Sequence, residues 1–447
     1  MTARPRLGAL WAACLTLAAC SSSEPGRPDV VLIVLDTLRV DRTSLVDESL
    51  DTMPFLAEWA RGAVQFEDAS STSSWTAPAV ASLFTGVYPN QHGVDVGVWL
   101  FERLRRARPE LRLKALPRDL ETLPEVMRAA GYTTFGIADN PNISAEEGFS
   151  RGFDHFASAD YRGGAEVNGL LAEWLPAIRA AEPAFVYLHY MDPHWPYHGH
   201  GEPRAANPER SPRVEEVARY DAELRFLDTR LREAFAMLSL GDDAIVIVAS
   251  DHGEELYERG DAMEHRQHGF QLYDELVRVL LLVRDPERAP NGARVRAPVS
   301  LVDVLPTLQE ILGAPRSAQV AGSSVVPLYA QGEAPVAPRA LFVLRREVAE
   351  ADRRLQAVRE DNWKYIRTES DTGLTEELYD LTVDPGERDD RSQREPDRLA
   401  RLRERWRSFD QAAPRWDAEV VRQELTPEQA DRLRTLGYVD DSEAPTP

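Results

Sequence analysis

Three runs of apolar, largely β-branched residues constrain most strongly how this chain can fold. They read "DVVLIVLD" (29–36), "PAFVYLHYMDPH" (183–194) and "DAIVIVASDHG" (243–253). A continuous apolar run of this kind is typical of a strand that is buried on both faces of a parallel sheet. Stretches of helical character, such as 53–62 and 214–238, alternate with these runs. The sequence therefore predicts an α/β fold with a mostly parallel central sheet.

The character of the sequence changes after about Pro335. Three short alternating segments follow, each broken by charged turns: "ALFVLRR" (340–346), "RLQAVREDNWKYIRT" (354–368) and "EELYDLTVDPGER" (376–388). They predict a small antiparallel sheet, and the charged stretch 395–409 predicts a helix behind it. We therefore expect a large domain over 29–335 and a smaller C-terminal subdomain with its tail over 336–447.

The N-terminus resembles an export signal. Arg4 and Arg6 precede the apolar run "LGALWAACLTLAAC" (7–20), which is too short to span a bilayer. Its end, "LAAC" followed by "SSSEPG", is similar to a bacterial lipoprotein cleavage box. That resemblance implies a signal peptide over 1–19, cleavage before Cys20 and a lipid on the Cys20 sulfur.

The residues after the cleavage box predict where the protein is located. Residues 20–28 read as a Ser/Pro/Gly tether, and Ser21 beside the lipidated cysteine favours the outer membrane of a Gram-negative cell. We expect a lipid-anchored protein of the cell envelope, on the outer membrane or the periplasmic face. The alternative is a plain secretory leader that is cut nearby.

Cysteine count and charge exclude several classes of protein. The two cysteines, Cys14 and Cys20, both lie in the leader, so the mature domain has neither a disulfide nor a thiol nucleophile. The formal net charge of −22 argues against a nucleic-acid partner. It leaves an anionic substrate possible, because a bound cation can invert the local field.

The three buried runs end on chemically active side chains. The first ends at Asp36, the second continues into Asp192 and His194, and the third ends with Asp251 and His252. Ligands of open α/β sheets bind beyond the carboxyl ends of the strands. Each residue alone has an ordinary alternative, such as a cap or a satisfied surface histidine. Together they indicate a site for a divalent cation: zinc, manganese, calcium or magnesium.

The stretch "SWTAPAVASLFTG" (74–86) predicts a helix that begins near Thr76. Thr76 precedes Pro78 by two residues and the stretch ends on Gly86, which is typical of an N-cap, a first turn and a C-terminal glycine. The amides of such a turn also attract anions. Thr76 is therefore either a cap or a nucleophile whose hydroxyl a metal ion can deprotonate.

These motifs and several others occur in an order that resembles the sulfatase family of the alkaline phosphatase superfamily, over residues 28–439. The further motifs are "HGFQLYDELVRV", "LVDVLPTLQEILG", "NWKYIR", "EELYDLTVDPGE" and "LTPEQADRLRTLGYV". The resemblance implies an α/β/α sandwich as the catalytic domain over 29–335, with a smaller antiparallel C-terminal subdomain. It also implies metal-dependent cleavage of sulfate or phosphate esters through a covalent intermediate on Thr76.

The resemblance also implies a role for each site residue. Those that match the family's metal site are Asp36, Thr76, Asp251 and His252. His194, in "DPHWPY", matches a histidine that contacts the ester oxygens or the leaving group. His268 falls where relatives have a lysine or histidine near the same group, or it ligates a second metal. Asp192 is a weaker candidate, with structural solvation as its alternative.

The departures from the family pattern bear on the chemistry. Sulfatases carry Cys or Ser followed by x-Pro-x-Arg, and that Cys or Ser becomes formylglycine; here the nucleophile position is Thr76 and the Arg position is Val80. No formylglycine is expected, because threonine cannot give an aldehyde at that carbon. Thr37 replaces the second of two carboxylates. The stretch "GIADNPNIS" (136–144) lacks the family's lysine and histidine, and its Asn140 either touches a ligand oxygen or serves a turn.

A plain threonine with Asp, Asp and His is similar to the phosphoryl branch of the superfamily. We therefore expect a hydrolase of phosphate, phosphonate or sulfate esters in which phosphoryl chemistry is favoured, with an anionic ester as substrate. The alternatives are a sulfuric ester hydrolase that works without formylglycine, a phosphoethanolamine-type transferase, and a non-catalytic surface binding protein.

Overall fold

The computed structural model describes residues 27–105, 107–197, 211–260, 268–330, 339–348 and 352–421. The expected signal peptide, Cys20, almost all of the tether, the domain limit at 335 and the end of the tail lie outside these described residues.

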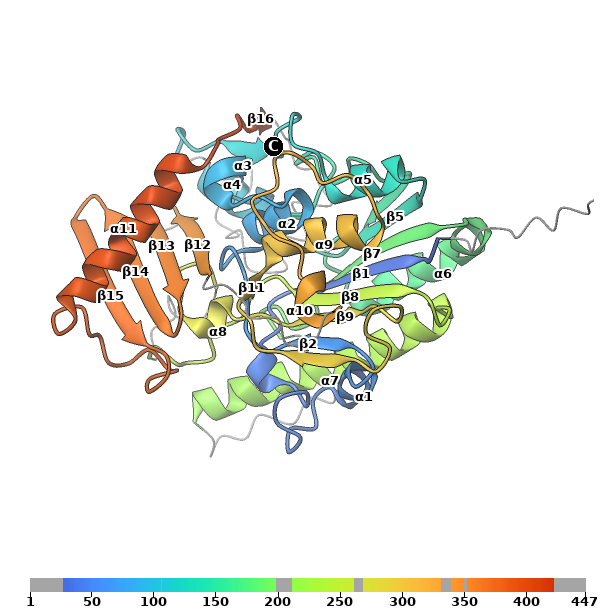
Figure 1. Ribbon diagram of the computed structural model, residues 1–447, viewed down its shortest axis with the longest axis horizontal. Helices are drawn as coiled ribbons and strands as arrows, with labels where there is room; N and C mark the ends of the chain where they lie inside the picture. The colour runs from blue at the N-terminus through green and yellow to red at the C-terminus, as the bar shows by residue number, and fades with distance from the viewer. Residues whose placement is uncertain are drawn as a thin grey trace, which may run out of the picture.

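An eight-stranded sheet forms the centre of the molecule, in the order β10-β2-β9-β8-β1-β7-β5-β6 (Figure 1). Its strands are β1 (Val30–Leu35), β2 (Val64–Phe66), β5 (Thr133–Ala138), β6 (His155–Ser158), β7 (Ala184–Tyr190), β8 (Ile245–Ser250), β9 (Leu281–Arg284) and β10 (Ala293–Val295). Strand β9 is antiparallel to both of its neighbours, and the other strand pairs are parallel. The predicted mostly parallel sheet is confirmed.

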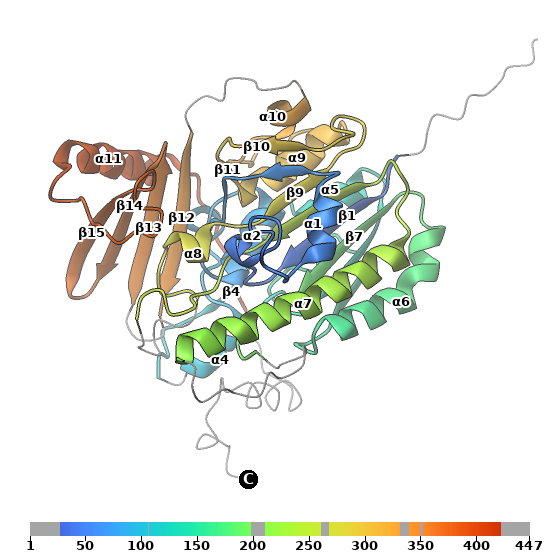
Figure 2. The same cartoon turned by 90° about the horizontal axis from the view of Figure 1, so that it is seen from below.

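Helices cover both faces of this sheet and so complete an α/β/α sandwich. One face carries α2 (Thr76–Thr85), α5 (Leu123–Ala129), α9 (Val304–Ile311) and α10 (Val326–Ala330). The other face carries α1 (Pro54–Ala60), α6 (Gly164–Ala180) and α7 (Pro212–Leu238), of which α6 and α7 lie side by side in Figure 2.

Strand β1 shows why the apolar runs are continuous. Its residues alternate between the two cores: Val30, Leu32 and Val34 pack on the α2 side, and Ile33 and Leu35 pack on the α7 side. All six residues of the strand are buried. Because each buried aliphatic side chain contributes about 1.5–3 kcal/mol, neither face tolerates a polar residue until the strand ends.

The C-terminal part forms a separate antiparallel sheet at one end of the molecule, as predicted (Figure 1). Its strands are β12 (Ala340–Glu347), β13 (Arg353–Glu360), β14 (Trp363–Ser370) and β15 (Gly373–Asp380), and helix α11 (Pro396–Ala412) covers one face. Phe342 and Phe409 stack at 3.7 Å between ring centroids, which fixes the helix on the sheet.

Shorter elements connect these layers. They are η1 (Val40–Arg42), β3 (Ala69–Ser70), α3 (Pro89–His92), α4 (Val98–Leu104), β4 (Leu113–Ala115), α8 (Asp274–Val277), β11 (Val299–Ser300), η3 (Leu301–Asp303) and β16 (Glu419–Val421). Within the described part of the chain, none of the helices has the length and apolarity needed to cross a membrane.

Candidate functional site

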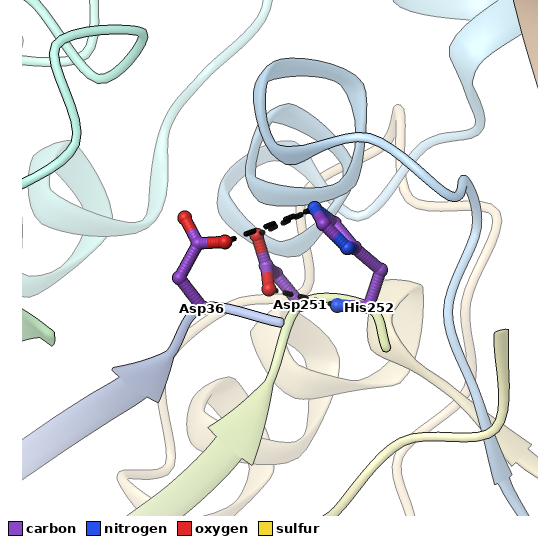
Figure 3. Close-up of side chains that lie close together, drawn as sticks. All are labelled: Asp36, Asp251 and His252. Carbon is purple, nitrogen blue, oxygen red and sulfur yellow. Dashed lines mark hydrogen bonds and ion pairs between the residues drawn. The ribbon is translucent and has the colours of Figure 1, made fainter. Parts of the chain in front are cut away.

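The ends of neighbouring strands bring Asp36, Asp251 and His252 together. Strand β1 lies between β7 and β8, and Leu35 is in register with both Tyr190 and Ser250. The residues that follow β1 and β8 therefore emerge at the same edge of the sheet (Figure 3). One ligand atom from each of the three residues lies within 4.8 Å of the others, and all three side chains are fully buried.

Local hydrogen bonds leave one donor atom of each residue facing the others. Asp251 Oδ1 accepts the backbone N–H groups of Thr37 (3.2 Å) and His252 (2.8 Å), and Asp251 Oδ2 has no hydrogen-bond partner among the described residues. His252 Nδ1 lies 2.9 Å from the carbonyl of Gly253, which makes Nδ1 the protonated nitrogen and leaves Nε2 as a ligand. Nε2 lies 3.5 Å from Asp251 Oδ2 and 3.9 Å from Asp36 Oδ1.

The electrostatics of these residues fit a divalent cation. Burial, and then the charge of Asp251, raise the pKa of Asp36 well above its usual value. Burial likewise raises the pKa of Asp251 to about 7 and lowers the pKa of His252. Two buried carboxylates with free oxygens are costly unless a positive charge lies between them. Carboxylate and imidazole donors suit zinc, manganese, magnesium or calcium, so the residues fit the expected metal ion.

Thr76 places its hydroxyl at this cluster. Its Oγ1 lies 3.3 Å from Asp36 Oδ2 and 3.2 Å from His252 Nε2. Thr76 is the first residue of α2, while Trp75 holds the N-cap position without a side-chain cap. The alternative that Thr76 is the N-cap is therefore wrong, because its hydroxyl turns toward the strand ends and away from its own helix. The four residues of the predicted metal site lie together.

Asn140, which follows β5, combines the two roles that the sequence left open. Its Nδ2 donates to Asp36 Oδ2 at 2.6 Å and lies 3.2 Å from Thr76 Oγ1. Its Oδ1 accepts the backbone N–H of Asn142 at 2.8 Å, which is an Asx turn. The turn holds the amide so that it fixes Asp36 Oδ2 and leaves Oδ1 toward His252.

His268 lies next to the cluster and is held by a residue that sequence reasoning missed. Its ring lies 4.5 Å from that of His252 and 4.9 Å from that of His194. Its Nδ1 lies 3.1 Å from Oε1 of Glu254, which is fully buried. Burial lowers the pKa of His268 well below its usual value and raises the pKa of Glu254 to about 8. The repeated glutamates of "DHGEE" were the available signal for Glu254.

The other predicted candidates lie nearby in different settings. His194 points its Nδ1 at the carbonyl of Trp195 and packs against His268. Asp192 Oδ1 accepts the backbone N–H of Gly164 at 2.9 Å, at the start of α6, which supports the structural alternative for Asp192. In the described part of the chain, the group with metal-binding geometry is Asp36, Asp251 and His252, without His268.

Two further residues near the site were not anticipated. His189, on β7, is fully buried, and its Nε2 lies 3.8 Å from Asp36 Oδ2. Arg345, on β12 of the C-terminal sheet, places its guanidinium 4.6 Å from the Trp75 ring and donates from Nε to the carbonyl of Gly269. A distant strand thus brings a cation close to the site, through its contact with the ring of Trp75.

Comparisons with known proteins agree with this geometry. Residues 28–314 match the family model described as sulfatase, and residues 264–405 match the model described as N-sulphoglucosamine sulphohydrolase, C-terminal. Arylsulfatase K of Rattus norvegicus is 33% identical over 160 residues, which are 34% of this chain and 27% of that protein. The match thus spans about a quarter of the length of this curated relative.

Two solved structures share the fold. A putative sulfatase from Bacteroides thetaiotaomicron superposes with a TM-score of 0.69 and 18% identity, covering 90% of this chain and 96% of that chain. The phosphonate monoester hydrolase of Agrobacterium radiobacter gives a TM-score of 0.68 and 20% identity, covering 90% and 99%. At these identities the likeness shows the fold. The sulfatase family model covers more than half of the chain, and the chain therefore belongs to the sulfatase family.

Proposed function

We propose that this protein is a metal-dependent ester hydrolase that uses Thr76 as a covalent nucleophile and prefers phosphate or phosphonate esters to sulfate esters. The observation that carries the proposal is the position of Thr76 Oγ1. It lies 3.3 Å from Asp36 Oδ2 and 3.2 Å from His252 Nε2, at the start of helix α2. A hydroxyl at the metal-ligand cluster and at a helix N-terminus is set to attack the phosphorus or sulfur atom of an anionic ester.

The residues of the site divide the reaction between them. Asp36, Thr76, Asp251 and His252 would hold a divalent cation, which stabilises negative charge on the threonine oxygen and on the ester. Thr76 releases its hydroxyl proton to solvent, and its Oγ1 forms a bond to phosphorus while the bond to the leaving oxygen breaks. His194 or His268 gives that oxygen a proton. Water then attacks the threonine ester, which releases phosphate or phosphonate and restores the hydroxyl.

The nucleophile favours phosphorus over sulfur. A formylglycine hydrate releases its sulfate by elimination, and a threonine ester has no such route. Water must attack the phosphorus or sulfur atom of a threonine adduct directly, and a cation beside phosphorus makes that attack feasible. The fold is shared about equally with a phosphonate monoester hydrolase and a putative sulfatase, so this preference rests on the nucleophile. The relatives named arylsulfatase K support the alternative, a sulfuric ester hydrolase that works without formylglycine.

A substrate panel tests the proposal. Metal-loaded wild type and the Thr76→Ala variant are compared on 4-nitrophenyl phosphate, bis(4-nitrophenyl) phosphate and 4-nitrophenyl sulfate, with Thr76→Ser as the matched control. We expect faster turnover of the phosphate esters, a loss of about 10⁴-fold or more in Thr76→Ala, and partial activity in Thr76→Ser. Equal turnover by wild type and Thr76→Ala would exclude Thr76 as the nucleophile. Faster turnover of the sulfate would establish the sulfatase alternative.

The same samples separate the remaining alternatives. When an alcohol such as glycerol is added to the assay, a transferase forms the phosphate ester of that alcohol instead of free phosphate. A non-catalytic binding protein gives no turnover with any ester and takes up no metal. The four residues that meet at the site favour an enzyme, because a binding surface has no need of a buried hydroxyl beside two buried carboxylates.

We further propose that the mature protein is attached to the cell envelope by a lipid on Cys20. The support is the box "LAAC" with its Ser21, together with the Ser/Pro/Gly tether that follows. Labelling of cells with radioactive palmitate should mark the wild-type protein and leave the Cys20→Ala variant unlabelled. Release of wild-type protein into the soluble fraction would support the plain secretory leader.

A further inference from the structure

A groove of about 450 Å³ lies where the catalytic domain meets the C-terminal sheet. Pro78, in the first turn of α2, and Pro89, at the start of α3, line one side of it. Lys114 of β4 and residues of β12, β13 and α11 line the remainder. None of the metal-ligand residues contributes to the groove, so it is a feature separate from the catalytic cluster.

The lining of this groove is basic in a chain that is strongly acidic overall. Its basic residues are Lys114, Arg345, Arg346, Arg354 and Arg415, and its acidic residues are Asp95 and Asp410. The whole chain carries a formal charge of −22. A local excess of positive charge in such a protein concentrates anions where the surrounding surface repels them.

The carboxylates of the groove do not compensate all of its cations. Asp95 Oδ2 is shared by Lys114 Nζ (3.4 Å) and Arg346 Nη1 (3.2 Å). Arg354 is exposed, and within the described residues its side chain has no salt bridge or hydrogen bond. Arg354 is therefore available to an anion from solution.

Arg345 links the groove to the catalytic cluster. Its side chain is 4% exposed and donates to two backbone carbonyls, of Gly269 (3.2 Å) and Asp95 (2.6 Å). Among the described residues it has no salt bridge to a carboxylate, and burial lowers its pKa to about 10 although the charges of Glu347 and Asp95 oppose that shift. The guanidinium lies against the Trp75 ring, and that ring lies 5.0 Å from the ring of His268. One aromatic side chain separates the groove from the site.

We infer that the groove binds a second anionic group of the same substrate molecule, a carboxylate, sulfate or phosphate, while the reacting ester lies at Thr76. The substrate is then a multiply charged ester, such as a sugar that carries an acidic group besides the reacting one. This inference rests on the proposed function. Guanidinium and ammonium groups make charge-assisted hydrogen bonds to such anions, and Arg354 is the exposed guanidinium of the groove.

Calorimetric titration of the metal-loaded Thr76→Ala protein tests the inference without turnover. The probes are glucose 6-phosphate and glucose 1,6-bisphosphate, which differ in one phosphate group. We expect the bisphosphate to bind about tenfold more tightly. Adding Arg354→Gln or Lys114→Gln should remove most of this advantage. The matched control is Arg296→Gln, which removes the same charge from an exposed arginine paired with Glu67 outside the groove, and it should keep the advantage.

The outcomes distinguish this inference from the proposed function. No preference for the bisphosphate, or a preference lost equally in Arg354→Gln and Arg296→Gln, overturns the groove as a subsite. A preference that depends on Arg354, in a protein whose wild type hydrolyses no ester, supports the groove and contradicts the proposed function. Hydrolysis of glucose 6-phosphate by the wild type, without tighter binding of the bisphosphate, supports the proposed function and contradicts the groove as a subsite. Circular dichroism spectra that match wild type establish that each variant is folded.

Discussion

Two of the regions that hold buried charges, the edge of the central sheet that carries Asp36 and Asp251 and the C-terminal sheet, treat those charges differently. Beneath the C-terminal sheet, Lys364 Nζ lies 2.7 Å from Asp274 Oδ1 and 2.9 Å from Glu387 Oε1, so a cation meets two carboxylates. The edge of the central sheet where β1 and β8 end, the catalytic edge, carries Asp36 and Asp251. Both are fully buried, and within the described residues neither has a salt bridge to lysine or arginine.

The difference shows in the pKa values. Despite burial, the Lys364 ammonium holds the pKa of Asp274 below its usual value, and the two carboxylates beside Lys364 raise the pKa of Lys364, although burial still raises the pKa of Glu387 to about 7. Burial raises the pKa of Asp36 and Asp251, and within the described residues neither has a lysine or arginine in salt-bridge contact. In the C-terminal region a lysine of the protein pairs with both carboxylates, so we interpret that cluster as structural. At the catalytic edge the carboxylates of Asp36 and Asp251 lack a lysine or arginine partner, which is the condition for binding a cation and, with it, an anionic ester.

The largest expected effect comes from neutralising the catalytic edge. Asp251→Asn should reduce turnover of 4-nitrophenyl phosphate by about 10⁴-fold, because the cluster loses a charged ligand. Metal content measured by mass spectrometry should fall in parallel. The control is Asp192→Asn, which should keep the wild-type metal content because Asp192 bonds a backbone N–H of α6. Full metal content in Asp251→Asn would contradict the assigned ligand set.

The converse change in the C-terminal region should affect stability and leave metal binding intact. Lys364→Met removes the cation from two carboxylates and should lower the free energy of unfolding by about 3–5 kcal/mol, measured by urea titration. The triple variant Lys364→Met, Asp274→Asn, Glu387→Gln should recover most of this loss, because it leaves no unpaired charge. A single variant as stable as wild type would show that the two regions do not differ in this way.

A smaller effect should separate the two candidate proton donors. Glu254→Gln keeps a hydrogen-bonding group beside His268 Nδ1 and removes the titratable carboxyl group. If His268 protonates the leaving oxygen, turnover of phenyl phosphate should fall by about 100-fold, and turnover of 4-nitrophenyl phosphate, whose leaving group needs less help, should fall by less than about tenfold. Equal losses on the two esters would favour His194 as the donor.

The smallest expected effect is on the pH dependence of stability in EDTA. The folded-state pKa values of Asp251 (about 7) and Glu254 (about 8) lie above their usual 3.8 and 4.5. Between pH 6.5, the usual pKa of histidine, and pH 8 the folded protein therefore binds protons that the unfolded chain does not, whereas below pH 6.5 the lowered pKa values of His252 and His268 act in the opposite direction. Stability should rise as pH falls through this range, by about 1 kcal/mol per pH unit, in urea titrations. Asp251→Asn should flatten the slope; stability that rises with pH would contradict these pKa shifts.

Much of the site could be predicted because its residues lie beside strong local signals. Asp36, Asp251 and His252 end apolar runs, and Thr76 stands at a helix start. Residues with a weaker signal were missed or left open. Glu254 contacts His268 across 14 residues of sequence, and Asn140 contacts Asp36 across 104. Nothing in the residues around either one indicates its partner.

The sequence by itself determined the alternation of buried strands and helices, the antiparallel C-terminal sheet and the chemical type of the site, because periodicity and strand ends are local properties. The tertiary structure decided which side chains meet. Sheet order places β1 between β7 and β8, the turn of Asn140 aims its amide at Asp36, and β12 brings Arg345 to Trp75. These contacts depend on pairing between distant segments, and one stretch of sequence does not encode its neighbours in space.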